Sequence, residues 1–239
     1  MDNIFSRTEA LLGTDAMKKL KNARVALFGL GGVGSAAFEA LLRSGVGHID
    51  VFDYDSVSVT NLNRQLLATN KTIGLKKTEA AKFRAKDICE DTEITAHDMF
   101  YLPENSAEID MAEFDFVIDA VDTVTAKLEI IKRAKEADVP LISCMGTGNK
   151  TDITKLRISD IKKTEGCPLA RAVRKELRAR GIFDLLVVWS DEKPEQKEAT
   201  NDLKGNRPAP ASAIFVPAAA GLILAEQAVK YLTNKNSDL

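Results

Sequence analysis

The chain has little of the residue chemistry that binds structural metals or forms disulfide frameworks. Its 239 residues include three cysteines, two histidines and one tryptophan. Three is an odd number, and the spacings between Cys89, Cys144 and Cys167 match no disulfide pattern or zinc module. With only His48 and His97 as imidazole donors, a four-ligand zinc site is not expected. We therefore expect a protein of a reducing, cytoplasmic compartment.

The chain also lacks an excess of charge of either sign. It has 33 basic and 35 acidic residues, a formal net charge of −2, and 45% hydrophobic residues. This balance excludes a disordered chain and a global basic field, so nucleic-acid binding would need a local patch. We see no signal-peptide pattern. One charge-free run, residues 208–225, contains three prolines and a glycine, and we interpret it as a buried strand and a buried helix rather than a membrane span.

Apolar segments alternate with helical ones along the first 150 residues. We expect strands at 23–28, 48–53, 93–98, 114–120 and 140–144, and helices at 1–22, 35–43, 76–90 and 124–137. Further on we expect strands at 151–158 and 185–189, a basic helix at 168–180, a polar loop at 191–206 and a closing helix at 217–232. The alternation predicts an α/β, Rossmann-like fold, with a doubly wound, mostly parallel sheet, helices on both faces and a C-terminal extension of the sheet.

A glycine-rich turn joins the first expected strand to the helix that follows it. Gly29, Gly31 and Gly34, with Gly32 between them, satisfy the dinucleotide-binding fingerprint. Glycines allow close approach to a phosphate, and the helix N-terminus offers unpaired N–H donors. Asp53 ends the second strand, where a carboxylate binds ribose hydroxyls. The pattern predicts a nucleotide site for NAD, FAD or ATP, and the alternative is a tight turn without a ligand.

Polar and cationic residues follow the second strand. Residues 53–65 read DYDSVSVTNLNRQ, and residues 73–77 read IGLKK. A dehydrogenase needs no such cluster, because its glycine turn already holds the pyrophosphate. A triphosphate carries more negative charge, which Arg64 as a planar fork and Lys77 as a point charge would compensate. These residues favour ATP, and the alternative is a solvated surface turn.

The order of these motifs resembles the ubiquitin-activating-enzyme-like superfamily, which includes the ThiF, MoeB and HesA proteins. The matching elements are G-x-G-G-x-G-S, D-x-D, N-x-x-R-Q, G-x-x-K and D-x-x-D. The resemblance implies a homodimer that adenylates a substrate carboxylate with ATP and magnesium. It implies a nucleotide site made of Gly29, Gly31, Gly32, Gly34, Asp53, Asp55, Asn61, Arg64, Gln65, Lys77 and Asp122.

Four of the residues are expected to be catalytic. The resemblance implies that Arg64 and Lys77 contact the phosphates, that Asp122 faces the magnesium ion, and that Arg7 reaches a partner's site across the dimer interface. Independently, Asp122 follows a strand at the sheet edge where α/β proteins bind ligands, and one carboxylate is a suitable magnesium ligand. The alternatives are a helix N-cap for Asp122 and a surface charge for Arg7.

The second half of the chain resembles the tRNA threonylcarbamoyladenosine dehydratases. The resemblance is carried by CPLARAVRKELRAR at 167–180, DIKKT at 160–164 and VPAAAG at 216–221. The paired Cys-x-x-Cys motifs common in sulfur-carrier adenylyltransferases are absent. Helical spacing puts four cations on one face, which could follow tRNA phosphates, with two lysines extending it. The expected tRNA contacts are Lys162, Lys163, Arg171, Arg174, Lys175 and Arg178. The alternative is a solvated helix face.

The resemblance implies cyclisation of threonylcarbamoyladenosine in tRNA. ATP adenylates the free carboxylate, the neighbouring carbamoyl group attacks the activated carbon, and AMP leaves. We expect one domain over residues 1–239, with an ATP-binding part at 1–150 and an acceptor-binding and dimerisation part at 151–239. An adenylyltransferase for a sulfur-carrier protein, an NAD-dependent dehydrogenase and a non-catalytic scaffold stay open, as do a reactive Cys167 and a sulfur-transfer partner.

Overall fold

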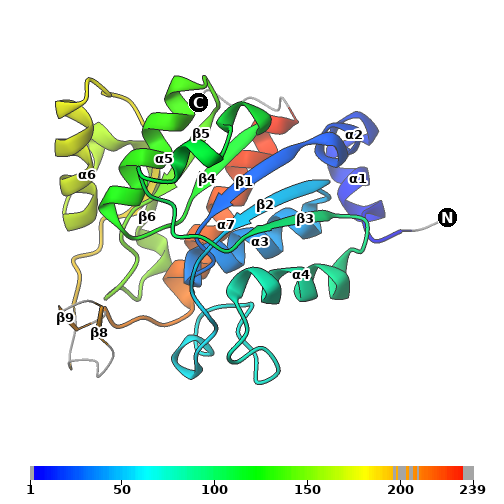
Figure 1. The fold of residues 1–239 in the computed structure, drawn as a ribbon, viewed down its shortest axis with the longest axis horizontal. Coiled ribbons are helices and arrows are strands. Elements are labelled where there is room, and N and C mark those ends of the chain that lie inside the picture. Colours follow the sequence, from blue (N-terminus) through cyan, green and yellow to red (C-terminus); the bar gives the residue numbers. More distant parts are fainter. Residues whose placement is uncertain (1–2, 196–197, 199–202, 205–206, 209, 234–239) are drawn as a thin grey trace.

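A seven-stranded sheet forms the centre of the molecule. The computed structural model describes residues 3–195, 198, 203–204, 207–208 and 210–233. The strand order is β3-β2-β1-β4-β5-β7-β6, and β6 pairs antiparallel with β7 while the other neighbours are parallel (Figure 1). The strands are β1 (Arg24–Phe28), β2 (His48–Phe52), β3 (Glu93–His97), β4 (Phe116–Asp119), β5 (Leu141–Cys144), β6 (Leu156–Asp160) and β7 (Leu186–Ser190). The predicted fold class, including the C-terminal extension of the sheet, is confirmed.

Helices cover both faces of the sheet. They are α1 (Ser6–Leu12), α2 (Thr14–Asn22), α3 (Gly32–Ser44), α4 (Lys77–Ile88), α5 (Val124–Glu136), α6 (Pro168–Ala179) and α7 (Phe215–Leu232). Short 3₁₀ helices occur at Val59–Asn61, Ser106–Glu108, Met111–Glu113, Ile153–Lys155 and Ile161–Lys163, and β8 (Leu203–Lys204) pairs with β9 (Arg207–Pro208). Helices α3, α4 and α7 pack on one face, and α5 and α6 on the other.

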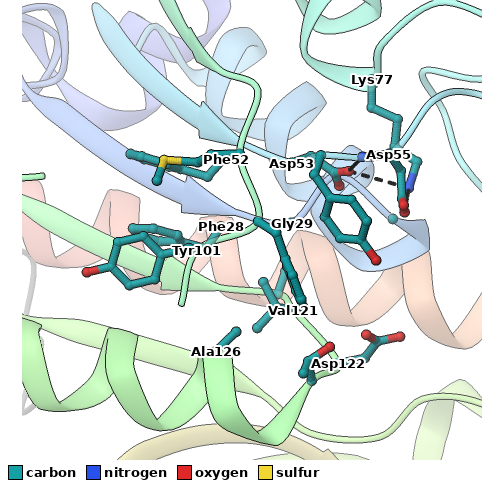
Figure 2. A pocket seen from close by; sticks show the side chains of 16 residues that line it. Phe28, Gly29, Phe52, Asp53, Asp55, Lys77, Tyr101, Val121, Asp122 and Ala126 are labelled. Atoms are coloured by element: carbon teal, nitrogen blue, oxygen red, sulfur yellow. Dashed lines mark hydrogen bonds and ion pairs between the residues drawn. The ribbon is translucent and has the colours of Figure 1, made fainter. Parts of the chain in front are cut away.

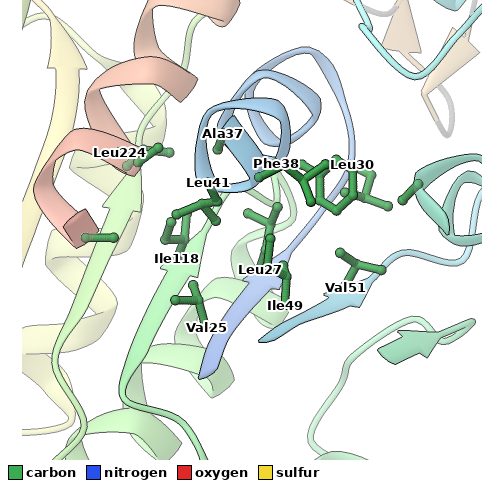
Figure 3. Close-up of a cluster of buried hydrophobic side chains, with 14 of the residues drawn as sticks. Val25, Leu27, Leu30, Ala37, Phe38, Leu41, Ile49, Val51, Ile118 and Leu224 are labelled. Atoms are coloured by element: carbon green, nitrogen blue, oxygen red, sulfur yellow. The ribbon is translucent and has the colours of Figure 1, made fainter. Parts of the chain in front are cut away.

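Two apolar layers hold the helices to the sheet. Because side chains alternate along a strand, Val25 and Leu27 of β1 join the layer under α3 and α7, while Ala26 and Phe28 join the layer under α5 and α6. Figure 3 shows the first layer, in which Leu224 of α7 lies over β4. The strand ends are thereby fixed from both sides, which is the rigidity that a site at the sheet edge requires.

Helix α7 crosses α3 at close range. A Cβ atom on Gly221 would lie 2.2 Å from the carbonyl oxygen of Val33 and 2.9 Å from Cβ of Ala36. Among the described helices, α7 is long and apolar enough to cross a membrane by length and composition. Core helices of water-soluble proteins share this composition, and the face of α7 around Gly221 is buried against α3.

The structure corrects three of the expected elements. The predicted N-terminal helix is two helices, because Gly13 breaks it with a φ of 93°. The strand predicted at 151–158 starts at Leu156, after the Asp152 side chain accepts a hydrogen bond from Thr154 N and starts a 3₁₀ helix. The strand predicted before α7 is wrong, since residues 210–213 form no strand and the backbone of Ala211 bonds Asn149 instead of the sheet. Half of the polar loop predicted at 191–206 lies outside the described residues.

Candidate active site

A cleft opens at the carboxyl ends of β1, β2 and β4. The strand order reverses between β1 and β4, and open α/β sheets bind ligands at such a switch point. The space of the cleft, including its open mouth, is about 630 Å³. Figure 2 shows the aromatic rings of Phe28, Phe52 and Tyr101 on one side of Gly29, and the charged side chains on the other.

The glycine turn between β1 and α3 forms one wall of the cleft. Gly29 has a φ of 90°, and a Cβ atom there would lie 2.9 Å from the Ala120 carbonyl oxygen. A Cβ atom on Gly34 would overlap the Gly29 carbonyl oxygen at 1.7 Å. Helix α3 starts at Gly32 without a side-chain cap, so its first N–H groups keep their capacity to bind an anion. Gly29 and Gly31 line the cleft, while Gly32 and Gly34 set the approach of the helix.

Asp53, Asp55 and Lys77 form a charged group beside this turn. The Lys77 ammonium donates to Asp55 Oδ2 at 2.7 Å and lies 3.7 Å from Asp53 Oδ1. The Asp53 carboxylate accepts hydrogen bonds from Leu30 N and Asp55 N. Burial raises the pKa of the Asp53 carboxyl, and the Lys77 charge and the backbone donors only partly oppose this. Asp53 therefore ties β2 to the glycine turn, where its oxygens also line the cleft.

Asp122 lies across the cleft on the loop between β4 and α5. Its side chain is exposed and lines the cleft, while the N-cap position of α5 belongs to Thr123. The pKa of the Tyr54 hydroxyl is raised by burial and by the charges of Asp55, Asp122 and Asp53. Three carboxylates thus act on one point of the cleft, with Lys77 as the cation among them.

Several predicted site residues lie beside the cleft rather than on its walls. Arg64 donates from Nη1 to Thr60 O at 2.7 Å and to Asn63 Oδ1 at 3.0 Å, with its stem next to Gly32. The Asn61 side chain accepts from Ser58 N and caps a 3₁₀ helix. Two more predicted residues are also outside the cleft walls: Gln65, which is buried, and Arg7, which is exposed on α1.

The basic face predicted on α6 divides into two kinds of residue. Arg171, Lys175 and Arg178 are exposed, but Arg174 is half-buried and donates from Nη1 to Ile161 O and Thr164 O. Arg174 thus fixes the turn that carries two further predicted contacts, Lys162 and Lys163, which are exposed. The Lys162 ammonium nitrogen lies 3.8 Å from Asp160 Oδ2.

Sequence reasoning missed two features of the site. One is the group of aromatic rings along one side of the cleft. The ring centroids of Phe28 and Phe52 stack 4.2 Å apart, and the Tyr101 ring meets Phe28 edge-on. The other is a buried ion pair between Asp119 and Lys127 directly behind the Asp122 loop. The signal for the first was an aromatic residue at the end of each of two neighbouring strands. Cys167, left open as a nucleophile, is buried in the layer under α6.

The fold has counterparts among known proteins. The model of the ThiF family matches residues 5–239. The chain belongs to the ThiF family. It is 45% identical over 230 residues to the tRNA threonylcarbamoyladenosine dehydratase of Bacillus subtilis, covering 92% of this chain and 91% of that protein.

Two further comparisons place this ThiF-family chain more closely. It superposes on a crystal structure of Escherichia coli tRNA N6-threonylcarbamoyladenosine dehydratase, TcdA, in complex with ATP, with a TM-score of 0.87 and 32% identity over 97% of this chain and 94% of that one. The adenylyltransferase and sulfurtransferase MOCS3 of Culex quinquefasciatus is 35% identical over 55% of this chain and 30% of that protein. Similarity to the dehydratases therefore extends through the second half of the chain, and similarity to MOCS3 covers a smaller part of it.

Proposed function

We propose that this chain is an ATP-dependent tRNA threonylcarbamoyladenosine dehydratase. The observation that carries the proposal is the similarity to the Bacillus subtilis dehydratase over nine-tenths of both chains. The cleft supports the use of ATP, since its glycine turn, uncapped helix and Lys77 suit a polyphosphate. An NAD-dependent dehydrogenase would leave the buried Lys77 without a substrate group to contact.

The reaction joins the threonylcarbamoyl carboxylate to AMP and then closes a ring. A carboxylate oxygen attacks the α-phosphorus of ATP and pyrophosphate leaves. The neighbouring carbamoyl group of the same nucleoside then attacks the activated carbonyl carbon and gives up a proton, and AMP leaves carrying one oxygen atom of the former carboxylate, so the nucleoside has lost the elements of one water. Ring closure is intramolecular, so proximity supplies much of its rate. No step of this scheme uses an enzyme thiol, so the scheme assigns no task to Cys167.

The cleft residues have separate tasks in this scheme. Asp53 and Asp55 bind the ribose side of the nucleotide, and the N-terminus of α3 and Lys77 hold its phosphates. Arg64 lies next to the start of α3, and its guanidinium would leave its carbonyl partner to reach the triphosphate. Asn61 and Gln65 belong to the same turn, in which the Asn61 carbonyl accepts from Arg64 N and Gln65 N. These cations stabilise the charge that develops at the α-phosphate and on the leaving pyrophosphate.

A magnesium ion fits the donor set of the cleft. Three carboxylates and one ammonium leave a negative surplus there, which would repel a free triphosphate. No cluster of three or more metal-binding side chains occurs in the described part of the chain, as expected for an ion held by one carboxylate and phosphate oxygens. Asp122 is the residue that would hold it. When bound, the ion neutralises phosphate charge.

The remaining parts of the proposal concern the assembly and the RNA. We propose a homodimer in which the exposed Arg7 reaches the partner's cleft, because it lies outside the cleft of its own chain. Residues 1–150 form the ATP-binding part and 151–239 the acceptor-binding and dimerisation part of one adenylation unit. The exposed cations of α6 contact tRNA phosphates. A cytoplasmic location is supported by three cysteines that are free and buried.

Mass spectrometry of tRNA nucleosides tests the proposal. The protein is incubated with ATP, magnesium and tRNA that carries threonylcarbamoyladenosine, and the digested nucleosides are compared with an ATP-free control. Loss of one water mass from the modified nucleoside, together with AMP formation, is the expected result. Pyrophosphate release with a Gly-Gly-tailed carrier protein and none with tRNA would overturn the proposal in favour of a carrier adenylyltransferase.

A further inference from the structure

Three polar side chains form a closed network behind the Asp122 loop. Lys127 Nζ donates to Asp119 Oδ2 at 2.8 Å and to Ser143 Oγ at 3.1 Å, and Ser143 Oγ donates to the same Asp119 oxygen at 2.6 Å. The Asp119 and Lys127 side chains are 0% exposed. The network joins the end of β4, the first turns of α5 and the end of β5, so it links the elements that enclose the loop at 120–123.

The second oxygen of Asp119 holds the loop itself. Asp119 Oδ1 accepts a hydrogen bond from Val121 N at 3.2 Å. On the opposite side, the Ala120–Val121 peptide packs on the glycine turn, since a Cβ atom on Gly29 would lie 2.9 Å from Ala120 O and 3.1 Å from Val121 N. The loop is therefore held between the network and the turn, and Asp122 is the next residue along it.

Stability alone does not account for a fully buried ion pair at this place. Removing two charges from water is costly, and replacing such a pair by apolar residues is often neutral or stabilising. A small shift of a group in an active site, by contrast, reduces turnover strongly. The place of the network, between the sheet and a loop that lines the cleft, indicates a role in geometry.

We propose that Asp119, Lys127 and Ser143 are positioning residues that set the place of Asp122 opposite the glycine turn. The inference rests on the proposed function, because it assigns the network a task in ATP-dependent turnover. Without the network, the carboxylate that accepts from Val121 N loses its side-chain links to α5 and β5, while the backbone hydrogen bonds from Ala120 N to Phe28 O and from Lys127 N to Thr123 O remain. Turnover and its dependence on magnesium then change more than ATP binding does, because the glycine turn and Lys77 are untouched.

Two variants and one control test the proposal. Lys127→Met leaves a buried carboxylate without its cation. The neutral pair Asp119→Asn with Lys127→Met avoids an uncompensated charge and is the variant to use if the first fails to fold. Lys150→Met is the matched control, since Lys150 is also buried and bonds through Nζ at 3.0 Å to a backbone carbonyl of β7, Ser190 O, and not to a side chain of the network.

The expected result separates turnover from binding. Both network variants should lose about tenfold to a hundredfold in kcat. They should need a several-fold higher magnesium concentration for half-maximal rate, with an ATP Kd within about threefold of the wild type. Amide hydrogen exchange at Val121 should become about tenfold faster. Lys150→Met should keep the wild-type kcat and the wild-type rate of amide hydrogen exchange at Val121.

Each opposing result has a distinct meaning. Wild-type kcat and magnesium dependence in the folded neutral pair would overturn the inference, as would equal losses in Lys150→Met. If the wild type converts no nucleoside at all, the proposed function fails. The exchange measurement still decides the inference in that case, because unchanged exchange at Val121 in the network variants means that the network does not hold the loop.

Discussion

Removal of the Lys77 ammonium tests both the stability of the cleft and its chemistry. Lys77→Met keeps the length of the side chain, which is 6% exposed, and deletes a charge 2.7 Å from Asp55 and 3.7 Å from Asp53. Breaking a fully buried pair costs about 3–5 kcal/mol. Asp55 is 45% exposed, so water replaces part of the lost interaction, and we expect a loss of about 2 kcal/mol in the free energy of unfolding. For a chain of this length, that corresponds to a fall in Tm of about 4–8 °C.

The same substitution should have a larger effect on catalysis. A preorganised donor aimed at developing charge contributes about 10²–10³ in kcat, and Lys77 is the ammonium on the wall of this cleft. The assay is AMP formation from labelled ATP with modified tRNA, beside thermal unfolding with and without ATP. ATP at 100 times its Kd should stabilise the wild type by about 2.7 kcal/mol. Most of this stabilisation should be lost in the variant.

The control is Lys82→Met, an exposed lysine on the same helix whose partner is Glu79. It should keep wild-type turnover and the ATP-induced rise in Tm. If Lys77→Met turned over substrate as fast as Lys82→Met, Lys77 would have no contact with the transferring phosphate. The placement of the triphosphate over the glycine turn would then be refuted.

Three other variants follow from the geometry. Gly221→Leu should lower stability by more than about 3 kcal/mol in urea unfolding, because its Cβ atom would clash with a backbone carbonyl of α3. Burial opposes ionisation of Asp50, yet hydrogen bonds from a histidine and Arg24 hold its pKa below the usual value. Ionised Asp50 therefore stabilises the fold above about pH 4, and Asp50→Asn should flatten the loss of stability as pH falls below that value. Lys175→Ala with Arg178→Ala should weaken tRNA binding and reduce its salt slope by about 1.5, and an unchanged slope would reject the α6 surface.

Local sequence patterns predicted the fold because the alternation of apolar residues and the glycines of a tight turn are visible within each segment. The alternation in β1 places Val25 and Leu27 under one helical layer and Phe28 under the other. The glycine turn is equally local, since Gly29 and Gly34 are the residues whose Cβ atoms the turn has no space for. Corrections concentrate in residues 149–155 and 210–214, where side-chain caps and long-range backbone pairs decide the conformation.

The polar residues of the site were harder to predict, because their partners are distant in sequence. A lysine in the middle of a helix is normally solvated, and nothing local to Lys127 indicates that Asp119 and Ser143 enclose it. Helical spacing groups Arg174 with the other cations of α6. It does not indicate that the Arg174 side chain bonds carbonyl groups of the 161–164 turn. Periodicity identifies the face of a helix and leaves its neighbours undetermined.

The charges of the cleft indicate that the proposed triphosphate needs a cation besides Lys77. Asp53, Asp55 and Asp122 act on the same point of the cleft, and Lys77 is already engaged by two of them. A triphosphate entering this cleft adds negative charge, so compensation must come from elsewhere, and Arg64 is the cation next to the start of α3. Its present acceptors are one backbone carbonyl and one amide oxygen, both exposed, so its release costs little. In the proposed function, Arg64 therefore supplies the positive charge that the cleft lacks when the triphosphate binds.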